Sequence, residues 1–170
     1  MRNRSRAVVD ILTRAPGAAL ASVAGLVVGL GAGPGGAAVP QARVTSGEVV
    51  VTVVGLRNAR GMLRACMTDE ASDFPKCDRP AHDRSEAITA ADTVTLTFKD
   101  VPAGRYAIAL FHDENGNGKM DRTMLFIPRE GFGFSRDAKV RMGPPKFGAA
   151  AFDVVGGANE HLVIHMRYLF

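Results

Sequence analysis

The stretch HDENGNGKMD, residues 112–121, places oxygen-bearing side chains at alternate positions, followed by a glycine and a final aspartate. This order, D-x-N-x-N-G-x-x-D, matches the first nine positions of an EF-hand calcium loop. In such a loop the glycine allows a sharp turn and the next residue offers its backbone carbonyl. Carboxylate, amide and carbonyl oxygens are the ligands that Ca²⁺ prefers. The predicted ligands are Asp113, Asn115, Asn117, Lys119 through its carbonyl, and Asp121.

The loop is not a complete EF-hand. Its twelfth position, where a bidentate glutamate belongs, is Met124, so another segment must supply the missing oxygens. Glu130 and Asp137 are the nearest candidates. So few charged ligands predict weak binding, with a dissociation constant on the order of 10⁻⁴ to 10⁻³ M. The alternative is a plain turn, because Asn-Gly is a strong hairpin signal. One Asn-Gly pair is enough for a hairpin, however, and a plain turn does not account for Asp121.

Three phenylalanines stand beside glycines after this loop, Phe132 and Phe134 in IPREGFGFS and Phe147 in GPPKFG. One interpretation is that they pin a long connection onto the domain. The other is a ligand-binding ledge next to the metal loop, with Arg129 and Glu130 as its polar contacts.

Signatures of catalysis are missing from the sequence. It contains no G-x-S-x-G, no H-E-x-x-H and no recognisable Cys–His spacing. A binding or interaction module is therefore favoured over an enzyme. The alternative is a cofactor-free hydrolase that would use His112, Ser135 or Arg129.

The N-terminus has the order of a secretory signal: basic residues, an apolar stretch and a small-residue cleavage site. Four arginines precede an uncharged run from Ala15 to Ala42, and Gly36 and Ala38 are small residues at its end. We expect a signal peptide at 1–38, a linker at 39–46 and a β-domain at 47–170, located in the periplasm or secreted. An uncleaved N-terminal anchor is the alternative, and only in that case would the chain have a membrane as partner.

Charge and cysteine content agree with export. The net charge is +4, but four arginines and one aspartate belong to residues 1–38, so the remainder is nearly neutral. This excludes a basic surface for nucleic acid. Cys66 and Cys77 are the only cysteines, and an oxidising compartment predicts a disulfide between them. Two separate buried thiols are the alternative.

The elements that would position these residues are short strands, because the apolar pattern after residue 46 has a period of two. In the strand at 92–98, Val94, Leu96 and Phe98 share one face. Long loops are expected at 69–87 and 128–148. About seven strands with turns between them predict an all-β, antiparallel sandwich. The expected strands are 48–56, 62–68, 92–98, 105–113, 123–127, 149–155 and 161–169.

The segments VPAGRYAIALFHDENGNGKMDRTMLFIPREGFGFS and GPPKFGAAAF resemble the DUF2141 family of exported bacterial proteins. The resemblance covers roughly Glu48 to Tyr168. It departs from the family pattern at Phe126, usually glycine, and at Asp137, often asparagine. It implies a transthyretin- or immunoglobulin-like sandwich and an export signal, but no established activity. A protein, a glycan or a small molecule could be the ligand of such a module.

Overall fold

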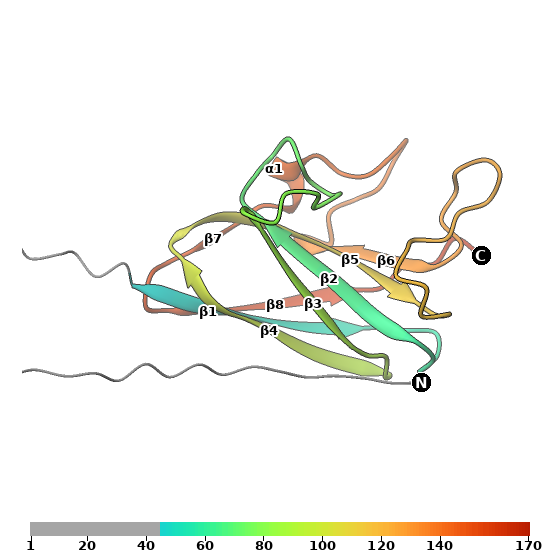
Figure 1. The fold of residues 1–170 in the computed structure, drawn as a ribbon, viewed down its shortest axis with the longest axis horizontal. Helices are drawn as coiled ribbons and strands as arrows, with labels where there is room; N and C mark the ends of the chain where they lie inside the picture. The colour runs from blue at the N-terminus through green and yellow to red at the C-terminus, as the bar shows by residue number, and fades with distance from the viewer. Residues whose placement is uncertain (1–44) are drawn as a thin grey trace, which may run out of the picture. The chain divides into compact units, whose positions relative to one another are not determined.

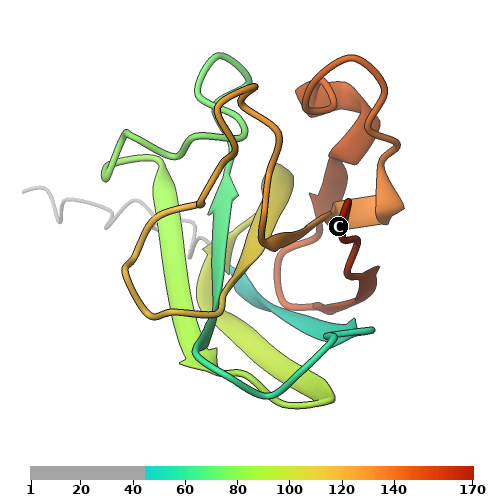
Figure 2. The same cartoon turned by 90° about the vertical axis from the view of Figure 1, so that its right-hand side faces the viewer.

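Eight β-strands form two sheets that face each other across a shared core (Figures 1 and 2). The computed structural model describes residues 45–170. One sheet has the order β4-β1-β8, and the other has the order β3-β2-β5-β6, with β7 paired to β5. This confirms the all-β sandwich, with eight strands where about seven were expected. The strands are β1 (Ser46–Val54), β2 (Met62–Thr68), β3 (Asp83–Thr89), β4 (Thr93–Pro102), β5 (Gly104–Asp113), β6 (Gly131–Phe134), β7 (Phe152–Val154) and β8 (Asn159–His165).

The predicted signal peptide, residues 1–38, and most of the predicted linker, residues 39–46, lie outside the described residues. Gln41–Phe170 forms one compact unit. Both sheets, the disulfide and the hydrophobic core belong to this unit, so it contains what it needs to fold on its own. No helix in residues 45–170 is long and apolar enough to cross a membrane.

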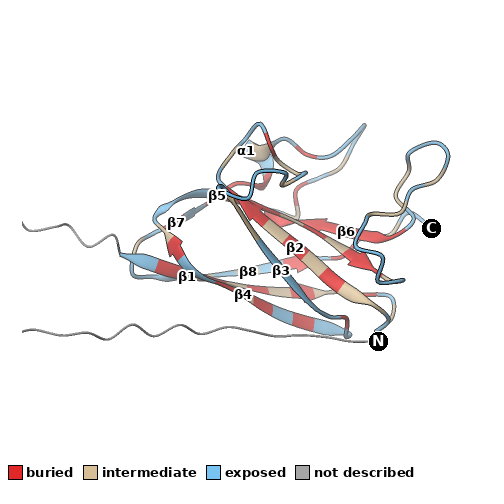
Figure 3. Ribbon diagram, viewed as in Figure 1, coloured by how far each residue is buried: buried red, intermediate tan, exposed pale blue. Residues whose placement is uncertain are grey.

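Alternation of apolar and polar residues builds the core. On β1 every second residue from Val49 to Val53 is fully buried, and the residues between them are partly exposed. The predicted face of β4, with Val94, Leu96 and Phe98, is confirmed as buried. Figure 3 shows the resulting bands of buried and exposed residues along both strands. The alternation therefore fixes which side of this sheet faces the second sheet.

One strand pair departs from the expected antiparallel arrangement. β1 pairs antiparallel with β4 but parallel with β8, so that Glu48 lies opposite Asn159 and Val54 opposite His165. A parallel pair needs a long crossover connection. Here the crossover consists of the whole second sheet, which the chain builds between β1 and β8. The three-stranded sheet is therefore mixed.

Part of the loop expected at 69–87 is a strand. β3 (Asp83–Thr89) pairs antiparallel with β2 along its whole length. It is an edge strand with exposed or partly exposed side chains throughout, so its sequence does not alternate between apolar and polar residues. Backbone hydrogen bonding to β2 holds it, and the sequence carries no signal for that.

The prediction of a strand at 123–127 is wrong, because these residues form a turn. The Thr123 amide donates to the Ile127 carbonyl at 2.8 Å, and the Phe126 amide donates to the Thr123 carbonyl at 2.9 Å, which closes a tight turn. Phe126 has φ 60°, in the left-handed region where glycine is favoured. The apolar run indicated a strand because such runs are usually buried, but Met124 to Phe126 are exposed here.

The connection expected at 128–148 contains β6 and the short 3₁₀ helix η1 (Ser135–Asp137). β6 pairs with β5, and all four of its residues are buried, so no alternation marks it as a strand. A Cβ at Gly131 would overlap the Tyr168 ring. The strand expected at 149–155 is shorter than predicted, because helix α1 (Phe147–Ala150) precedes β7.

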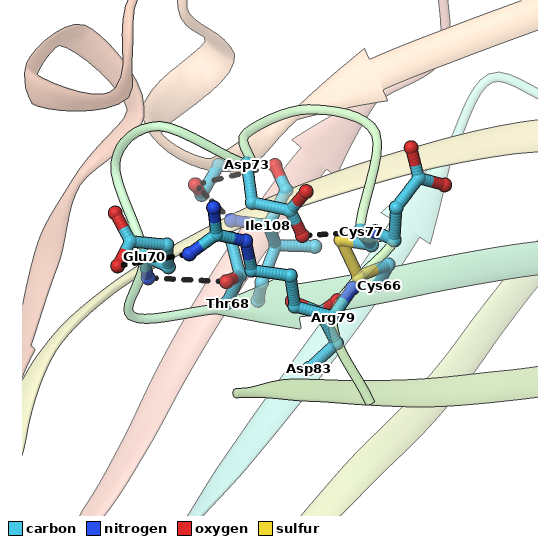
Figure 4. Close-up of a disulfide and its surroundings, with 10 residues drawn as sticks. Cys66, Thr68, Glu70, Asp73, Cys77, Arg79, Asp83 and Ile108 are labelled. Atoms are coloured by element: carbon cyan, nitrogen blue, oxygen red, sulfur yellow. Dashed lines mark hydrogen bonds and ion pairs between the residues drawn. A yellow bond between two sulfur atoms is a disulfide. The ribbon is translucent and has the colours of Figure 1, made fainter. Parts of the chain in front are cut away.

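Cys66 on β2 and Cys77 in the following loop form the predicted disulfide (Figure 4). The bridge closes the loop that carries Phe74. The Phe74 ring packs edge-on against Phe134, with 5.9 Å between the centres of the two rings. Asp73 is buried in the same loop and accepts a hydrogen bond from the Asp78 amide at 2.8 Å. The disulfide thus holds a loop that covers one side of the β3-β2-β5-β6 sheet.

Replacing both Cys66 and Cys77 with serine should lower the free energy of unfolding by about 3 kcal/mol, because the loop they close spans 11 residues of sequence separation. Urea unfolding of the Gln41–Phe170 unit measures the loss. Dithiothreitol should destabilise the parent by a similar amount and leave the double variant unchanged. A parent that is insensitive to dithiothreitol would contradict a stabilising bridge.

Candidate functional site

The Asn-Gly loop, residues 113–121, begins at the last residue of β5. The Asp113 carboxylate is fully buried and accepts hydrogen bonds from the backbone N–H groups of Asn117, at 2.9 Å, and Gly118, at 2.8 Å. Arg64 of β2 donates to it from Nε at 2.6 Å. Gly118 has φ 78°, a conformation that supports the sharp turn predicted there. The chain therefore curls tightly around the Asp113 carboxylate.

The remaining predicted ligands converge on Asp121. Its two carboxylate oxygens accept hydrogen bonds from the amide nitrogens of Asn115, at 2.7 Å, and Asn117, at 3.0 Å. The amide oxygens of these two asparagines accept backbone N–H groups of Asn117 and Lys119. Lys119 itself is exposed, and its carbonyl remains a predicted ligand. Polar groups of four predicted ligands thus gather within one small loop.

Glu130, one of the two candidates for the missing ligand, lies against this loop. Glu130 is only 4% exposed to solvent. One carboxylate oxygen accepts the Glu114 amide at 3.0 Å, and the other accepts the Asp121 amide at 3.0 Å. Glu130 therefore ties the two ends of the loop together from outside it. Met124, at the twelfth position, points into solvent instead.

The other candidate, Asp137, lies elsewhere. It accepts the His165 amide at 2.9 Å and contacts His165 Nδ1 at 2.7 Å, which links η1 to the end of β8. Asp137 has φ 48°, and this strained conformation suits its place in a turn. The expectation that it could complete the loop is not met, because this pairing holds its carboxylate.

The charges of the loop are unbalanced. Of the three carboxylates of Asp113, Asp121 and Glu130, only that of Asp113 forms an ion pair in residues 45–170, with Arg64. The charge of Arg57 also acts on Glu130, but its ion pair is with Glu114. Burial raises the pKa of Glu130 above its ordinary value, although the Asp121 and Glu114 amides oppose this, and the negative charges of Asp121 and Asp113 raise it further. In residues 45–170 no basic side chain forms an ion pair with Glu130 or Asp121.

Asp113, in contrast, is well compensated. Burial alone would raise the pKa of its carboxyl, but the Arg64 guanidinium and the amides of Gly118 and Asn117 outweigh burial and lower it. The excess negative charge of the loop therefore resides on Asp121 and Glu130.

Glu114, inside the loop, pairs with side chains of the β1–β2 turn rather than with the predicted calcium ligands. It forms a bidentate ion pair with Arg57, with Nε at 2.8 Å from Oε1, and accepts a hydrogen bond from Asn58 at 2.6 Å. The hydrogen bond from Arg57 is the main reason that the pKa of Glu114 falls to about 2. The Arg57 guanidinium also lies 4.5 Å from the centre of the Tyr168 ring. This pair anchors the loop to the β1–β2 turn.

A buried histidine, His112, directly precedes the loop at the end of β5. His112 is fully buried, with Nε2 at 2.7 Å from the Arg60 carbonyl and Nδ1 at 2.8 Å from the Tyr168 hydroxyl. A carbonyl can only accept, so Nε2 carries the proton and donates. The Tyr168 hydroxyl also accepts the Arg57 amide at 3.2 Å. His112 therefore connects the β1–β2 turn to the C-terminal segment. Its Nδ1 also lies 3.8 Å from the Glu114 carboxylate of the loop, and within residues 45–170 it forms no hydrogen bond with the predicted calcium ligands.

A metal site made only of acidic, histidine or cysteine side chains is not formed by the loop. In the part of the chain that the structure describes, one group brings three such ligand atoms within 4.8 Å of one another: Cys66, Cys77 and Asp83. Its two sulfurs are joined in the disulfide, so it offers no thiolate. A cation in the Asn-Gly loop would therefore depend on asparagine and backbone oxygens as well.

The residues of the alternative hydrolase are not brought together. Ser135 is fully buried, and its hydroxyl contacts only backbone groups, the Ile108 amide at 2.9 Å and the Ala150 carbonyl at 2.6 Å. His112 is held by Arg60 and Tyr168, as described above. Among residues 45–170, His112, Ser135 and Arg129 share no hydrogen bond, so they do not form a nucleophile–base pair.

The five residues of the predicted ledge do not share one surface. Phe132 and Phe134 are buried in a second hydrophobic cluster with alanines of β5 and α1, and Phe147 packs against this cluster. Glu130 is buried against the Asn-Gly loop, whereas Arg129 is exposed. The aromatic residues thus pin the long connection onto the sheet, which was the other interpretation of their pattern.

A shallow hollow lies next to the loop. It has two adjoining parts that share Thr123, Arg129 and Phe170. Arg57 of the β1–β2 turn lines the first part, and Met124 and Leu125 line the second. No local sequence pattern indicates this hollow, because its walls come from segments that are distant in sequence.

Other site residues that the sequence did not reveal are Arg64, Arg57 and Tyr168. Arg64 follows an apolar residue in β2 and lies opposite Phe111 on β5, which brings it within reach of Asp113. An arginine within a strand is a weak signal on its own. Its meaning depends on the strand register, which local sequence patterns do not provide.

Comparison with protein families matches residues 51–162 to the model of DUF2141, described as an uncharacterised protein conserved in bacteria. The matched segment contains the whole Asn-Gly loop and Glu130. No curated protein and no solved structure matches the chain.

Proposed function

This chain belongs to the DUF2141 family of bacterial proteins, and we propose that it works as an exported binding module whose Asn-Gly loop holds a structural calcium ion. Export is supported by the N-terminal sequence pattern and by the disulfide, which persists in oxidising compartments. The calcium ion would stabilise the loop between β5 and β6 and so fix the surface beside it.

The observation that carries the calcium proposal is the buried Glu130 carboxylate. A buried carboxylate without a cationic partner is costly, and proteins usually pair it or let it bind a metal. Within the described residues Glu130 has backbone donors but forms no ion pair with a basic side chain, and the charge of Asp121, also without an ion pair there, lies next to it. A divalent cation would neutralise these two charges with one ion.

The hydrogen bonds around Asp121 also support a cation at this place. The amide nitrogens of Asn115 and Asn117, which carry partial positive charge, point at its carboxylate. Rotation of both amides by half a turn would present their oxygens instead. This rotation would break the hydrogen bonds that the two amide oxygens accept from the backbone N–H groups of Asn117 and Lys119. The backbone N–H of Asn117 would keep its bond to Asp113, and the ion would have to compensate for the bonds that are lost.

Calcium should raise the melting temperature of the Gln41–Phe170 unit. With a dissociation constant of about 10⁻⁴ to 10⁻³ M, calcium at about 10 mM stabilises the folded state by about 1.5–3 kcal/mol. For a domain of this size that corresponds to an increase of about 5–10 °C relative to EDTA. Differential scanning calorimetry in calcium, magnesium and EDTA measures it. Magnesium should do less, because it demands a smaller octahedral site.

The variant Asp121→Asn tests the site with little change in shape. It removes one negative charge from the loop and should abolish most of the calcium response. Asp153→Asn is the matched control, because Asp153 is an exposed aspartate paired with Arg105 on β5, away from the loop. It should respond to calcium like the parent. An equal response of both variants, or none in the parent, would contradict a calcium site in the loop.

A further inference from the structure

The apolar side chains exposed on this domain are concentrated at one end. Of the nine large ones in residues 45–170, three lie in the turn at 123–127 and two at the chain end, Leu169 and Phe170. Met124, Leu125 and Phe126 are 100%, 78% and 79% exposed. Phe170 lines the same hollow as Met124 and Leu125, so the two groups are neighbours.

Phe126 combines two unfavourable properties. Its φ of 60° lies in the left-handed region, where a bulky side chain costs free energy and glycine does not. Its ring is also left in water. Strained residues persist where the surrounding structure holds them, and they cluster at functional positions. An aromatic residue in this place therefore needs an explanation other than folding.

The exposed charged side chains that flank this turn are basic, whereas the neighbouring carboxylates of Asp121 and Glu130 are partly or fully buried. Arg122 and Arg129 flank it on both sides, and Lys119 lies just before it. All three are exposed, and within residues 45–170 none forms an ion pair with a carboxylate. A turn with exposed apolar side chains, flanked by basic residues, is complementary to a surface that is apolar inside and negatively charged outside.

We propose that the turn at 123–127, the apolar tip, inserts into the surface of a bilayer that contains anionic lipids. Three consecutive side chains are exposed together, and two of them line the hollow while Phe126 does not. Phe126 therefore lies outside the surface that Met124 and Leu125 share. A protein groove would cover one side of such a turn, whereas fluid acyl chains can surround all of it. Arg122 and Arg129 would then meet the anionic headgroups.

The absence of tryptophan from the chain provides a direct test. Leu125→Trp places a single tryptophan at the tip, and Val155→Trp places one at an exposed apolar position in the β7–β8 connection. Both are made in the Gln41–Phe170 unit and mixed, in EDTA, with phosphatidylcholine vesicles with and without phosphatidylglycerol. We expect the emission of Leu125→Trp to shift to shorter wavelength with the anionic vesicles, and that of Val155→Trp to stay unchanged.

Two further variants separate the contributions. Arg122→Gln in the Leu125→Trp background should weaken binding to the anionic vesicles about fivefold. Phe126→Gly, measured in the same background, should weaken it about tenfold while keeping or raising the melting temperature, because glycine relieves the left-handed strain. Loss of binding with an intact fold assigns the effect to the tip.

An unshifted Leu125→Trp emission overturns the proposal and leaves a protein partner as the occupant of the tip. Equal shifts of Leu125→Trp and Val155→Trp, or unchanged affinity of Phe126→Gly, also overturn it. EDTA is present throughout, so these outcomes do not depend on whether the Asn-Gly loop binds calcium.

Discussion

Replacing Asp113 with alanine should lower the free energy of unfolding by about 2–4 kcal/mol, because two backbone N–H groups lose their acceptor and the partly exposed Arg64 loses its ion pair. The Asp113 carboxylate is fully buried and accepts hydrogen bonds from Arg64 and from two backbone amides of the Asn-Gly loop. Its removal leaves all three donors without their partner. Urea unfolding of the Gln41–Phe170 unit in EDTA measures the loss without any contribution from calcium.

Asp153→Ala is the matched control, since Asp153 is exposed and its pair with Arg105 should contribute about 0–1 kcal/mol. A double-mutant cycle with Arg64→Met separates the ion pair from the two amide bonds. If Asp113→Ala cost no more than Asp153→Ala, the carboxylate would not organise the loop.

Replacing His112 with phenylalanine should cost about 2–4 kcal/mol. Phenylalanine fills much of the same volume but cannot donate to the Arg60 carbonyl or accept from the Tyr168 hydroxyl. Buried polar groups left without partners cost about 1–3 kcal/mol each. Thermal and urea unfolding measure the loss, and hydrogen exchange of the 57–61 amides should report faster opening of the β1–β2 turn.

His161→Phe is the control for this substitution, because His161 is exposed on β8 and its replacement should change stability by about 0.5 kcal/mol or less. Tyr168→Phe removes only one of the two hydrogen bonds of His112 and should cost less than His112→Phe. Equal stability of His112→Phe and the parent would show that the histidine contributes only volume.

Much of the sandwich could be predicted because its central strands obey simple rules. β2 was expected at the residues where it occurs, and β1, β4 and β5 overlap their expected ranges. β1, β4 and most of β2 bury alternate side chains, and β5 is a largely buried apolar run. β3 and β6 escaped detection for opposite reasons. β3 has no buried residue and β6 has no exposed one, so neither alternates.

The site could be predicted only as far as local spacing reaches. The Asn-Gly loop closes on Asp113, and Glu130 lies against it, as the spacing and proximity in sequence suggested; the role of Glu130 as a calcium ligand stays a prediction. The partners that come from other strands were not predictable, because Arg64 reaches Asp113 through the register of β2 on β5. The prediction of a strand at 123–127 was wrong for another reason. The expectation assumed that a run of apolar residues is buried.

The parallel pairing of β1 with β8 has a consequence for how the domain folds. The strand at the centre of the smaller sheet, β1, has as one neighbour β8, the last strand of the described domain, which is synthesised well after β1. Proteins dominated by such distant pairings have high contact order and fold slowly, in roughly milliseconds to seconds. Until β8 arrives, one edge of β1 stays open and can pair with another chain. This domain is therefore most prone to aggregate as a nascent polypeptide, and a truncation before Asn159 would make that state permanent.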